Sequence, residues 1–236
     1  MPPMYAVCEF HLVALFSLRT LHANALAAQT LPCPTPAGVK MGLLSKLLER
    51  DGSQRGQEHL DWLAPLTIGW RPPGALAVTT ATVRAYKSDA AGKPLKGIVG
   101  MREYAHTDTP FALVLGPVSD ACRSDLAFAL CQLRALGNAE SLVQPVRPPD
   151  WVDAFPDGFV DLTREVSASD EHGHTVVLDD LGESPSWERL NVYRPHDRKL
   201  IPQIGPDRVR RIVALPLEVV HWTETGYALA LEWRRP

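Results

Sequence analysis

Two segments with helical spacing of apolar residues dominate the chain, and each is bounded by residues that start or stop a helix. In the first, Thr35 can cap the helix, Pro36 suits its first position and Gly52 follows its end. The second begins near residue 120 and stops at Gly137. Strand-like segments lie before, between and after the two. This order predicts an α+β fold with a ferredoxin-like core, the order also found in RNA-recognition (RRM-like) folds.

Seven segments rich in β-forming residues are expected to form strands. They cover residues 5–19, 76–86, 111–115, 175–178, 188–193, 208–220 with a break at Pro216, and 227–233. The polar segment 51–57 indicates a turn, and the glycine-bearing segment 88–100 indicates the tip of a protruding hairpin. We therefore expect a ferredoxin-like domain over residues 1–149, with a β-hairpin thumb at about 86–101. An irregular β-rich C-terminal extension over residues 150–236 should pack on it.

The charge balance argues against a protein that coats nucleic acid with its whole surface. The formal net charge is -3 and the isoelectric point about 6.2, whereas such proteins are usually basic. Any contact with RNA must therefore come from a local patch. The 4 cysteines form no Cys-x-x-Cys pair, so we expect reduced, mostly buried thiols, no zinc knuckle and no other cofactor.

The N-terminal apolar segment is expected to belong to the fold and not to be a targeting signal. Ala23-Asn24-Ala25 resembles a signal-peptidase site, but Glu9 and His11 interrupt the apolar run and no Lys or Arg precedes it. No other run approaches the ~18 apolar residues that a membrane span needs. We therefore expect a cytoplasmic protein that does not enter a membrane.

Three blocks of the sequence resemble, in order and spacing, the fifth CRISPR-associated (Cas) protein family of the RAMP superfamily. The first block is FHLVALFSLR at 10–19 with LPCPTP at 31–36; the others are MREY at 101–104 and LGNAESLV at 136–143. In that family an Arg closes the first strand and a proline-rich loop opens the first helix. An Arg-x-Tyr strand follows the thumb, and a Leu-Gly turn follows the second helix. The agreement covers roughly the first 145 residues.

This resemblance implies a fold and a role. Family members have a ferredoxin-like core and a thumb, and they bind the 5′ handle of the CRISPR RNA (crRNA) in the type I surveillance complex Cascade. By resemblance, the chain would cap the guide RNA, nucleate assembly, and contact the backbone and large subunits. It would reach target DNA near the protospacer-adjacent motif through the assembly. Most members do not cleave RNA, whereas those of one subtype process precursor crRNA without a metal.

Basic and aromatic residues in or beside these blocks are the candidates for RNA contact. They are Arg19, Thr35, Lys40, Lys87, Lys93, Lys96, Arg102 and Tyr104. Arg19 and Lys40 flank a helix start, where free N–H groups and the helix dipole favour phosphate. Arg102 and Tyr104 are two apart on an expected strand and should share one face. The alternatives are a solvated lysine, an arginine paired with a carboxylate, a solvated loop and a core tyrosine.

Two other groups of residues keep catalysis open as an alternative. Tyr104, His106 and Lys96 would form a metal-free endoribonuclease site if their side chains converged. The second group would suit a metal-dependent hydrolase or a structural metal site, and its members are Asp170, His172, His174 and His196, with Asp179, Asp180 or Asp197. We expect neither site, and the sequence has no glycine-rich nucleotide loop.

The C-terminal region is locally basic. Arg208 and Arg210 share one face of an expected strand, and Arg211 lies beside them. These side chains either contact RNA or an acidic neighbouring subunit, or they protect an edge strand by their charge.

Overall fold

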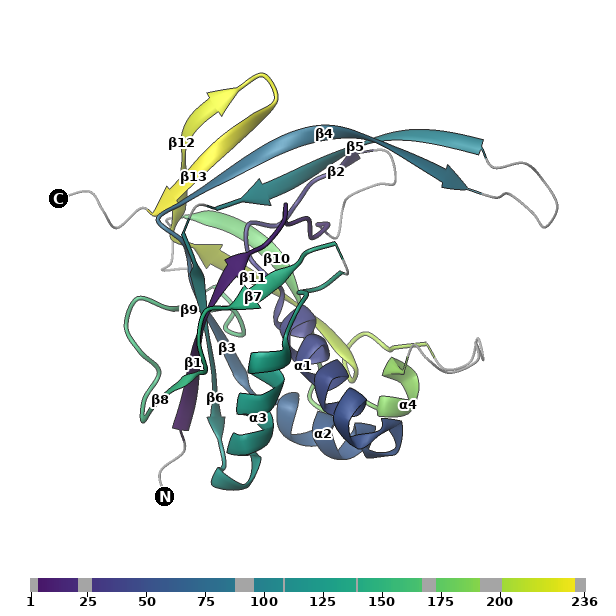
Figure 1. The fold of residues 1–236 in the computed structure, drawn as a ribbon, viewed down its shortest axis with the longest axis vertical. Helices are drawn as coiled ribbons and strands as arrows, with labels where there is room; N and C mark the ends of the chain where they lie inside the picture. The colour runs from purple at the N-terminus through teal and green to yellow at the C-terminus, as the bar shows by residue number, and fades with distance from the viewer. Residues whose placement is uncertain are drawn as a thin grey trace.

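The structure, a computed structural model, shows an α+β fold with two sheets and a two-stranded ribbon (Figure 1). It describes residues 4–20, 27–87, 96–107, 109–138, 140–166, 173–191 and 201–231. Within these ranges no helix is long and apolar enough to span a membrane. All four cysteines are free, and Cys8 and Cys33 are buried. Burial raises the pKa of both buried thiols, that of Cys8 to about 12.

The first sheet has the strand order of a ferredoxin-like core. Its strands are β1 (Met4–Leu12), β3 (Thr67–Arg71), β6 (Phe111–Val118), β7 (Val143–Pro145), β8 (Asp150–Val152) and β9 (Val160–Asp161). They lie in the order β7-β1-β6-β3-β9, all antiparallel, and β8 pairs with the other half of β1. Because β1, β3, β6 and β7 are the four strands of the core in chain order, this arrangement confirms the predicted ferredoxin-like topology.

Both predicted helices are confirmed, but the second ends at Gln132 and not at the predicted stop, Gly137, because the chain after it turns so that Ala135 bridges Leu142. α1 (Pro36–Asp51) begins where Thr35 Oγ1 accepts a hydrogen bond from the Gly38 N–H at 3.0 Å. It ends before Gly52, whose φ of 88° favours glycine. α3 (Asp120–Gln132) follows β6. The buried apolar side chains of the two helices join the core of the first sheet, and they include Val39, Leu43, Leu47, Leu126 and Leu130.

The turn predicted at 51–57 is wrong in its second half. A single 3-10 turn, η1 (Ser53–Arg55), leads directly into a further helix, α2 (Gly56–Leu63). Two helical turns are too short for apolar spacing to reveal them. Tertiary packing stabilises α2, because Leu60 and Leu63 are fully buried in the core.

The strand predicted at 188–193 is also wrong. Residues Trp187–Leu190 form a helical turn, α4, and the rest of that segment, apart from Asn191, lies outside the described residues. The Trp187 indole N–H donates to the Ser53 carbonyl at 2.9 Å, and the ring occupies the space beside Gly56. Docking on the start of α2 therefore overrides the local preference for a strand.

The first predicted strand, 5–19, ends earlier than expected. β1 stops at Leu12, and the chain then crosses to the second sheet, where Phe16 and Ala105 exchange backbone hydrogen bonds of 2.8 and 2.7 Å. Phe16 is buried between the two sheets. Burial of Phe16 at the crossing thus accounts for part of the apolar character of this segment, whereas Val13 and Leu15 are exposed. Arg19 follows the crossing instead of closing a strand.

The second sheet carries a long hairpin that projects from the body (Figure 1). Its order is β12 (Leu217–Thr223), β13 (Gly226–Leu231), β4 (Ala75–Lys87), β5 (Lys96–His106) and β2 (Ala27–Ala28). The predicted strand at 76–86 and the C-terminal hairpin are confirmed. The protruding hairpin differs in its bounds, because β4 and β5 pair as far as Lys87 and Lys96. Residues 96–100 therefore belong to a strand, and residues 88–95 lie outside the described part of the chain.

A loop from the C-terminal half covers the second face of the first sheet. It connects β8 to β9, and the Phe155 ring lies so close to Gly69 of β3 that an added Cβ would come within 2.6 Å of it. Tyr5 of β1 packs edge-on against the same ring, with centroids 6.0 Å apart. The face that RNA-recognition folds leave open for bases is therefore occupied here.

A buried ion pair fixes a ribbon of β10 (His174–Leu181) and β11 (Arg208–Leu215) to α1. Lys40 Nζ lies 2.8 Å from Asp180 Oδ1 and donates to the Ala64 carbonyl at 2.7 Å; both side chains of the pair are 2% exposed. Arg211 Nε donates to the other Asp180 oxygen at 3.0 Å. Burial lowers the pKa of Lys40, and the Asp180 carboxylate opposes that shift.

Lys40→Met should lower the free energy of unfolding by roughly 3–5 kcal/mol, because the buried Asp180 carboxylate would lose its closest cation. Urea unfolding followed by circular dichroism measures the change. Lys46→Met is the matched control on the same helix, since Lys46 pairs with the exposed Glu49 and its loss should cost less than about 1 kcal/mol. Equal effects of the two substitutions would contradict a structural role for Lys40.

Asp207 anchors the turn before β11. Its buried carboxylate accepts hydrogen bonds from Arg189 at 2.6 and 2.8 Å and from the N–H groups of Ser186 and Gln203. Burial alone would raise the pKa of Asp207, but these four hydrogen bonds outweigh burial and lower it to about 2. The turn is thus held by an ionised side chain with no exposed surface.

This lowered pKa predicts a pH-dependent stability. Because the folded-state pKa lies below the ~3.9 of an unfolded aspartate, the stabilisation is complete above about pH 5 and is lost as the pH falls toward 2. Asp207→Asn should therefore unfold at lower urea concentration than wild type at pH 7, and the difference should shrink between pH 5 and pH 3. A difference that stays constant over this range would contradict the assignment.

Candidate nucleic-acid interface

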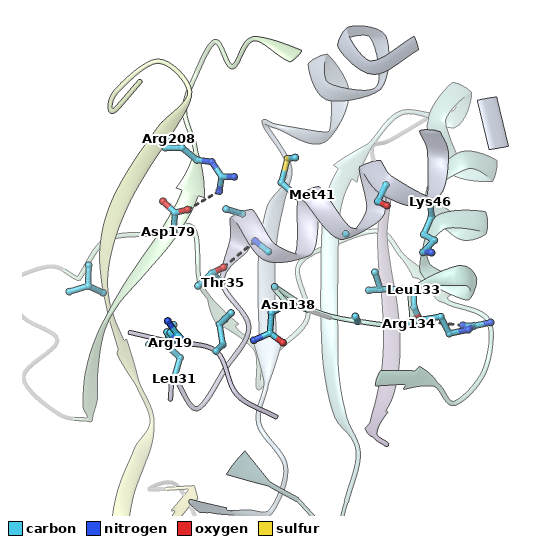
Figure 2. Close-up of a pocket in the computed structure, with 18 residues that line it drawn as sticks. Arg19, Leu31, Thr35, Met41, Lys46, Leu133, Arg134, Asn138, Asp179 and Arg208 are labelled. Carbon is cyan, nitrogen blue, oxygen red and sulfur yellow. Dashed lines mark hydrogen bonds and ion pairs between the residues drawn. The ribbon is translucent and has the colours of Figure 1, made fainter. Parts of the chain in front are cut away.

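A groove of about 590 Å³ runs along the exposed side of α1, between the β10–β11 ribbon and the loop after α3 (Figure 2). α1 contributes residues from Ala37 to Lys46. The ribbon contributes Asp179 and Arg208 at one end, and Arg134 lies at the other. The groove is therefore elongated along the helix and built from segments far apart in the sequence.

Glycines allow these segments to approach one another closely. An added Cβ at Gly38 would lie 3.3 Å from the Gly137 Cα, and one at Gly42 would lie 2.9 Å from Leu133 Cδ1. Gly137 has a φ of 78°, and its added Cβ would lie 2.4 Å from Leu18 Cδ1. Glycine inside a helix costs stability. Here it lets the backbone of α1 form the floor of the groove against the loop.

The loop after α3 holds the segment that carries Arg19. The Asn138 side-chain amide and the Ser141 hydroxyl both donate to the Ser17 carbonyl, the latter at 3.0 Å. The Ser17 N–H donates back to Ser141 Oγ at 3.2 Å. On its other side, the Leu18 N–H donates to Thr30 Oγ1 at 3.0 Å. This double attachment fixes the backbone of Arg19 at the groove and leaves its side chain exposed.

The described lining of the groove is predominantly cationic. Its basic side chains are Arg19, Lys46, Arg134 and Arg208, and its acidic side chain is Asp179. Arg208 lies 2.7 Å from Asp179, and burial raises the pKa of Asp179 although Arg208 opposes that shift. Lys46 pairs with Glu49, which lies beside the lining, at 2.7 Å. Arg134 donates to the carbonyls of Cys131 and Leu133, which are neutral, so its charge is not cancelled. No described acidic side chain pairs with Arg19. A positive strip on a chain of net charge -3 is a local feature that favours a phosphate-bearing ligand.

The blocks that carry the family resemblance meet beside this groove. The Thr30 N–H, just before the proline-rich loop, donates to Glu103 Oε2 at 3.0 Å. Arg102 of β5 lies 2.9 Å from Glu140 in the loop after α3. Together with the Ser17–Ser141 hydrogen bonds, these contacts join all three blocks. Sequence spacing alone gave no reason to expect their convergence on one place.

Two predicted RNA-binding residues at the helix start have different positions. Thr35 lies in the groove lining, but its Oγ1 caps α1. The prediction for Lys40 is wrong as a surface cation, because its ammonium group points away from the groove into the ion pair with Asp180. Lys40 and its neighbour Met41, which lines the groove, lie on different faces of α1 because successive helical residues are about 100° apart. The sequence pattern did not distinguish which face the ribbon would cover.

The predicted site residues of the β4–β5 hairpin do not all lie close to one another. Arg102, Tyr104 and His106 alternate along β5 and share one face, as predicted for the first two. Lys96 lies eight residues from Tyr104 on the same continuous strand, about 26 Å away at the usual rise. The endoribonuclease site of Tyr104, His106 and Lys96 therefore does not form within the chain. Lys93 lies outside the described residues, and Lys87 ends β4.

The proposed metal cluster is also not assembled among the described residues, in which no group of three or more His, Cys, Asp or Glu side chains could hold a metal. Asp179 and Asp180 are engaged with Arg208 and Lys40. His174 lies on β10, where burial lowers its pKa. The other members, Asp170, His172, His196 and Asp197, lie outside the described part of the chain.

Sequence reasoning missed Lys46 and Arg134 as candidates. Lys46 is on the polar face of an amphipathic helix, and Arg134 follows the end of α3, so both look like ordinary solvated residues in the sequence. Only the approach of α1 to the loop at Gly42 and Leu133 places them on one groove. The pair of glycines four residues apart in α1, Gly38 and Gly42, was the available signal for such a close approach.

Comparisons with known proteins do not identify a family for this chain. No family model matches the chain, and no curated protein matches it. Among solved structures, the crystal structure of a CRISPR protein from Archaeoglobus fulgidus is similar at 14% identity and a TM-score of 0.45, covering 97% of this chain and 92% of that one. A likeness at this level establishes neither a family nor a function for this chain.

Gly137→Ala should lower the free energy of unfolding by more than backbone strain at positive φ alone would, because the new methyl group would also collide with Leu18. Gly158→Ala is a matched control, since its φ of 79° is nearly the same as the 78° of Gly137 but nothing lies within 4 Å of an added Cβ. We expect a cost of about 1–2 kcal/mol for Gly158→Ala and a larger one for Gly137→Ala, measured by urea unfolding. Equal costs would show that Leu18 is not packed against this loop.

Proposed function

We propose that the chain binds the 5′ handle of a crRNA in a type I CRISPR surveillance complex, where it caps the guide and nucleates assembly without cleaving it. One observation carries the proposal: the three family-like blocks converge beside a groove lined by four basic side chains, of which Arg19 and Arg134 have no described acidic partner. A single-stranded RNA end presents phosphates to such a strip. Arg19 is the central contact, because it belongs to the first block and has no described acidic partner.

The projecting hairpin supplies a second contact surface. On the face that packs on the core at Val78 and Ala105, the hairpin continues outward with exposed Met101, Val99 and Tyr86. Arg84 lies opposite Val99 on the same face. Aromatic and apolar side chains beside a cation are suited to stacking against unpaired bases. In the proposed complex, this hairpin crosses the RNA next to the groove.

A neighbouring subunit has an apolar surface available beside the groove. Val13, Leu15 and Leu142 are 58%, 45% and 41% exposed, and the Val13 N–H donates to the Leu142 carbonyl at 3.1 Å. Exposed apolar side chains that gather in one place are typical of protein interfaces. We propose that a backbone or large subunit covers them in the assembly, and that target DNA is reached only through those subunits.

The same geometry disfavours the catalytic alternative. Cleavage without a metal needs an acid and a base within hydrogen-bonding reach of the scissile phosphate. The separation of Lys96 from Tyr104 along β5 leaves Tyr104 and His106 without the lysine of the proposed trio. Binding is therefore the proposed role.

Co-purification tests the proposal. The tagged chain, co-expressed with a CRISPR array and the products of adjacent genes, should retain short RNAs that share one 5′ sequence. Arg19→Ala should lower the retained RNA by roughly tenfold, because a charge-assisted hydrogen bond to phosphate contributes about 1.5–3 kcal/mol. Arg147→Ala is the control, since Arg147 is an exposed arginine paired with Asp150 away from the groove. Wild-type protein that retains no RNA, or RNAs with unrelated 5′ ends, would refute the proposal.

A further inference from the structure

We infer that the groove binds the sugar-phosphate backbone of a single strand and does not read its base sequence. This inference rests on the proposed function, since it specifies which part of the RNA occupies the same groove. Phosphate contacts set the position of a strand, whereas contacts to base edges or base faces specify its sequence. A groove that reads sequence therefore needs side chains that are available to base edges or base faces.

Each neutral polar side chain of the groove makes at least one hydrogen bond within the protein, which fixes its orientation. Asn138 Oδ1 accepts from the N–H groups of Glu140 and Ser141, both at 2.9 Å, and its amide donates to Ser17. Thr35 Oγ1 accepts from Gly38. The Ser45 hydroxyl donates to Glu49 at 3.4 Å. Amides and hydroxyls are the usual readers of base edges, and here they hold the protein together.

The described walls of the groove also contain no aromatic ring. Apart from the polar residues and the small residues of its floor, the lining consists of aliphatic or thioether side chains: Leu18, Leu31, Met41, Leu133 and Val177. Recognition of unpaired bases relies mainly on stacking against aromatic rings. The exposed aromatic ring of the described hairpin, Tyr86, lies on β4 and not among these lining residues.

The cations, in contrast, suit a phosphate track. From Ala37 to Lys46 the groove follows α1 for about 14 Å, which corresponds to roughly two to four phosphates of one strand. Arg208 and Arg134 are held in position by Asp179 and by backbone carbonyls. Arg19 is the basic residue with the greatest freedom to contact a base, so the experiment must separate its contact with phosphate from a contact with guanine.

Fluorescence anisotropy with the full chain tests this inference. Labelled eight-nucleotide RNAs of one length but different sequence (oligo-U, oligo-C, oligo-A and a guanine-containing mixture) are titrated at several salt concentrations. The measured quantity is the ratio of dissociation constants for Arg19→Ala/Arg134→Ala and wild type, taken separately for each RNA. Because each RNA is measured with both proteins, differences in stacking within the free RNAs cancel.

We expect the double substitution to weaken binding at least tenfold, by the same factor within threefold for every RNA. The slope of log affinity against log salt should fall by about 1.4, corresponding to two lost phosphate contacts. Arg147→Ala should change neither quantity. A ratio that depends on base identity, above all a larger loss for the guanine-containing RNA, would overturn the inference and leave RNA binding by the groove intact. Binding unaffected by the double substitution, or absent in wild type, would overturn both.

Discussion

The buried pair of Lys40 and Asp180 determines how the two halves of this chain meet. Removing two charges from water is costly, and it is offset here because each carboxylate oxygen has its own cation and the lysine has a second acceptor in Ala64. The pair fixes the β10–β11 ribbon at one distance from α1. Asp179, the next residue on the ribbon, faces the groove and holds Arg208 there. The width and charge of the groove at this end therefore depend on a buried interaction that lies outside the groove lining.

The other wall of the groove depends on backbone contacts. Gly38 and Gly42 bring α1 against the loop after α3, and that loop holds Ser17 through Asn138 and Ser141. Hydrogen bonds that are used for this purpose are unavailable to a ligand. In a site built in this way, the cations are the main side chains left to contact a ligand. Cations bind phosphates of any sequence, so we expect the groove to hold phosphates irrespective of sequence.

Closure of the sheet face by Phe155 explains why the ferredoxin-like topology alone would mislead. In RNA-recognition folds the open sheet presents aromatic residues to bases, whereas here Tyr5 and Gly69 lie under the loop that connects β8 to β9. Basic residues gather instead on the helical side. With a net charge of -3, the long-range field of the molecule does not assist RNA binding, so a strand bound in the groove depends on short-range contacts with its cations.

The sequence by itself determined the local structure with strong periodic signals: α1 with its Thr35 cap and Gly52 stop, α3, the strand at 76–86 and the C-terminal hairpin. These features depend on residues close together in the chain, and their order was enough to predict the ferredoxin-like core. Arg19 could be named as a candidate because a family-like block ends there. Only the tertiary structure decided that Lys40 faces inward, that Lys96 lies far from Tyr104, and that Lys46 and Arg134 border a groove. Each of these depends on contacts between segments more than thirty residues apart or on the length of a strand, which the periodicity of a single segment does not encode.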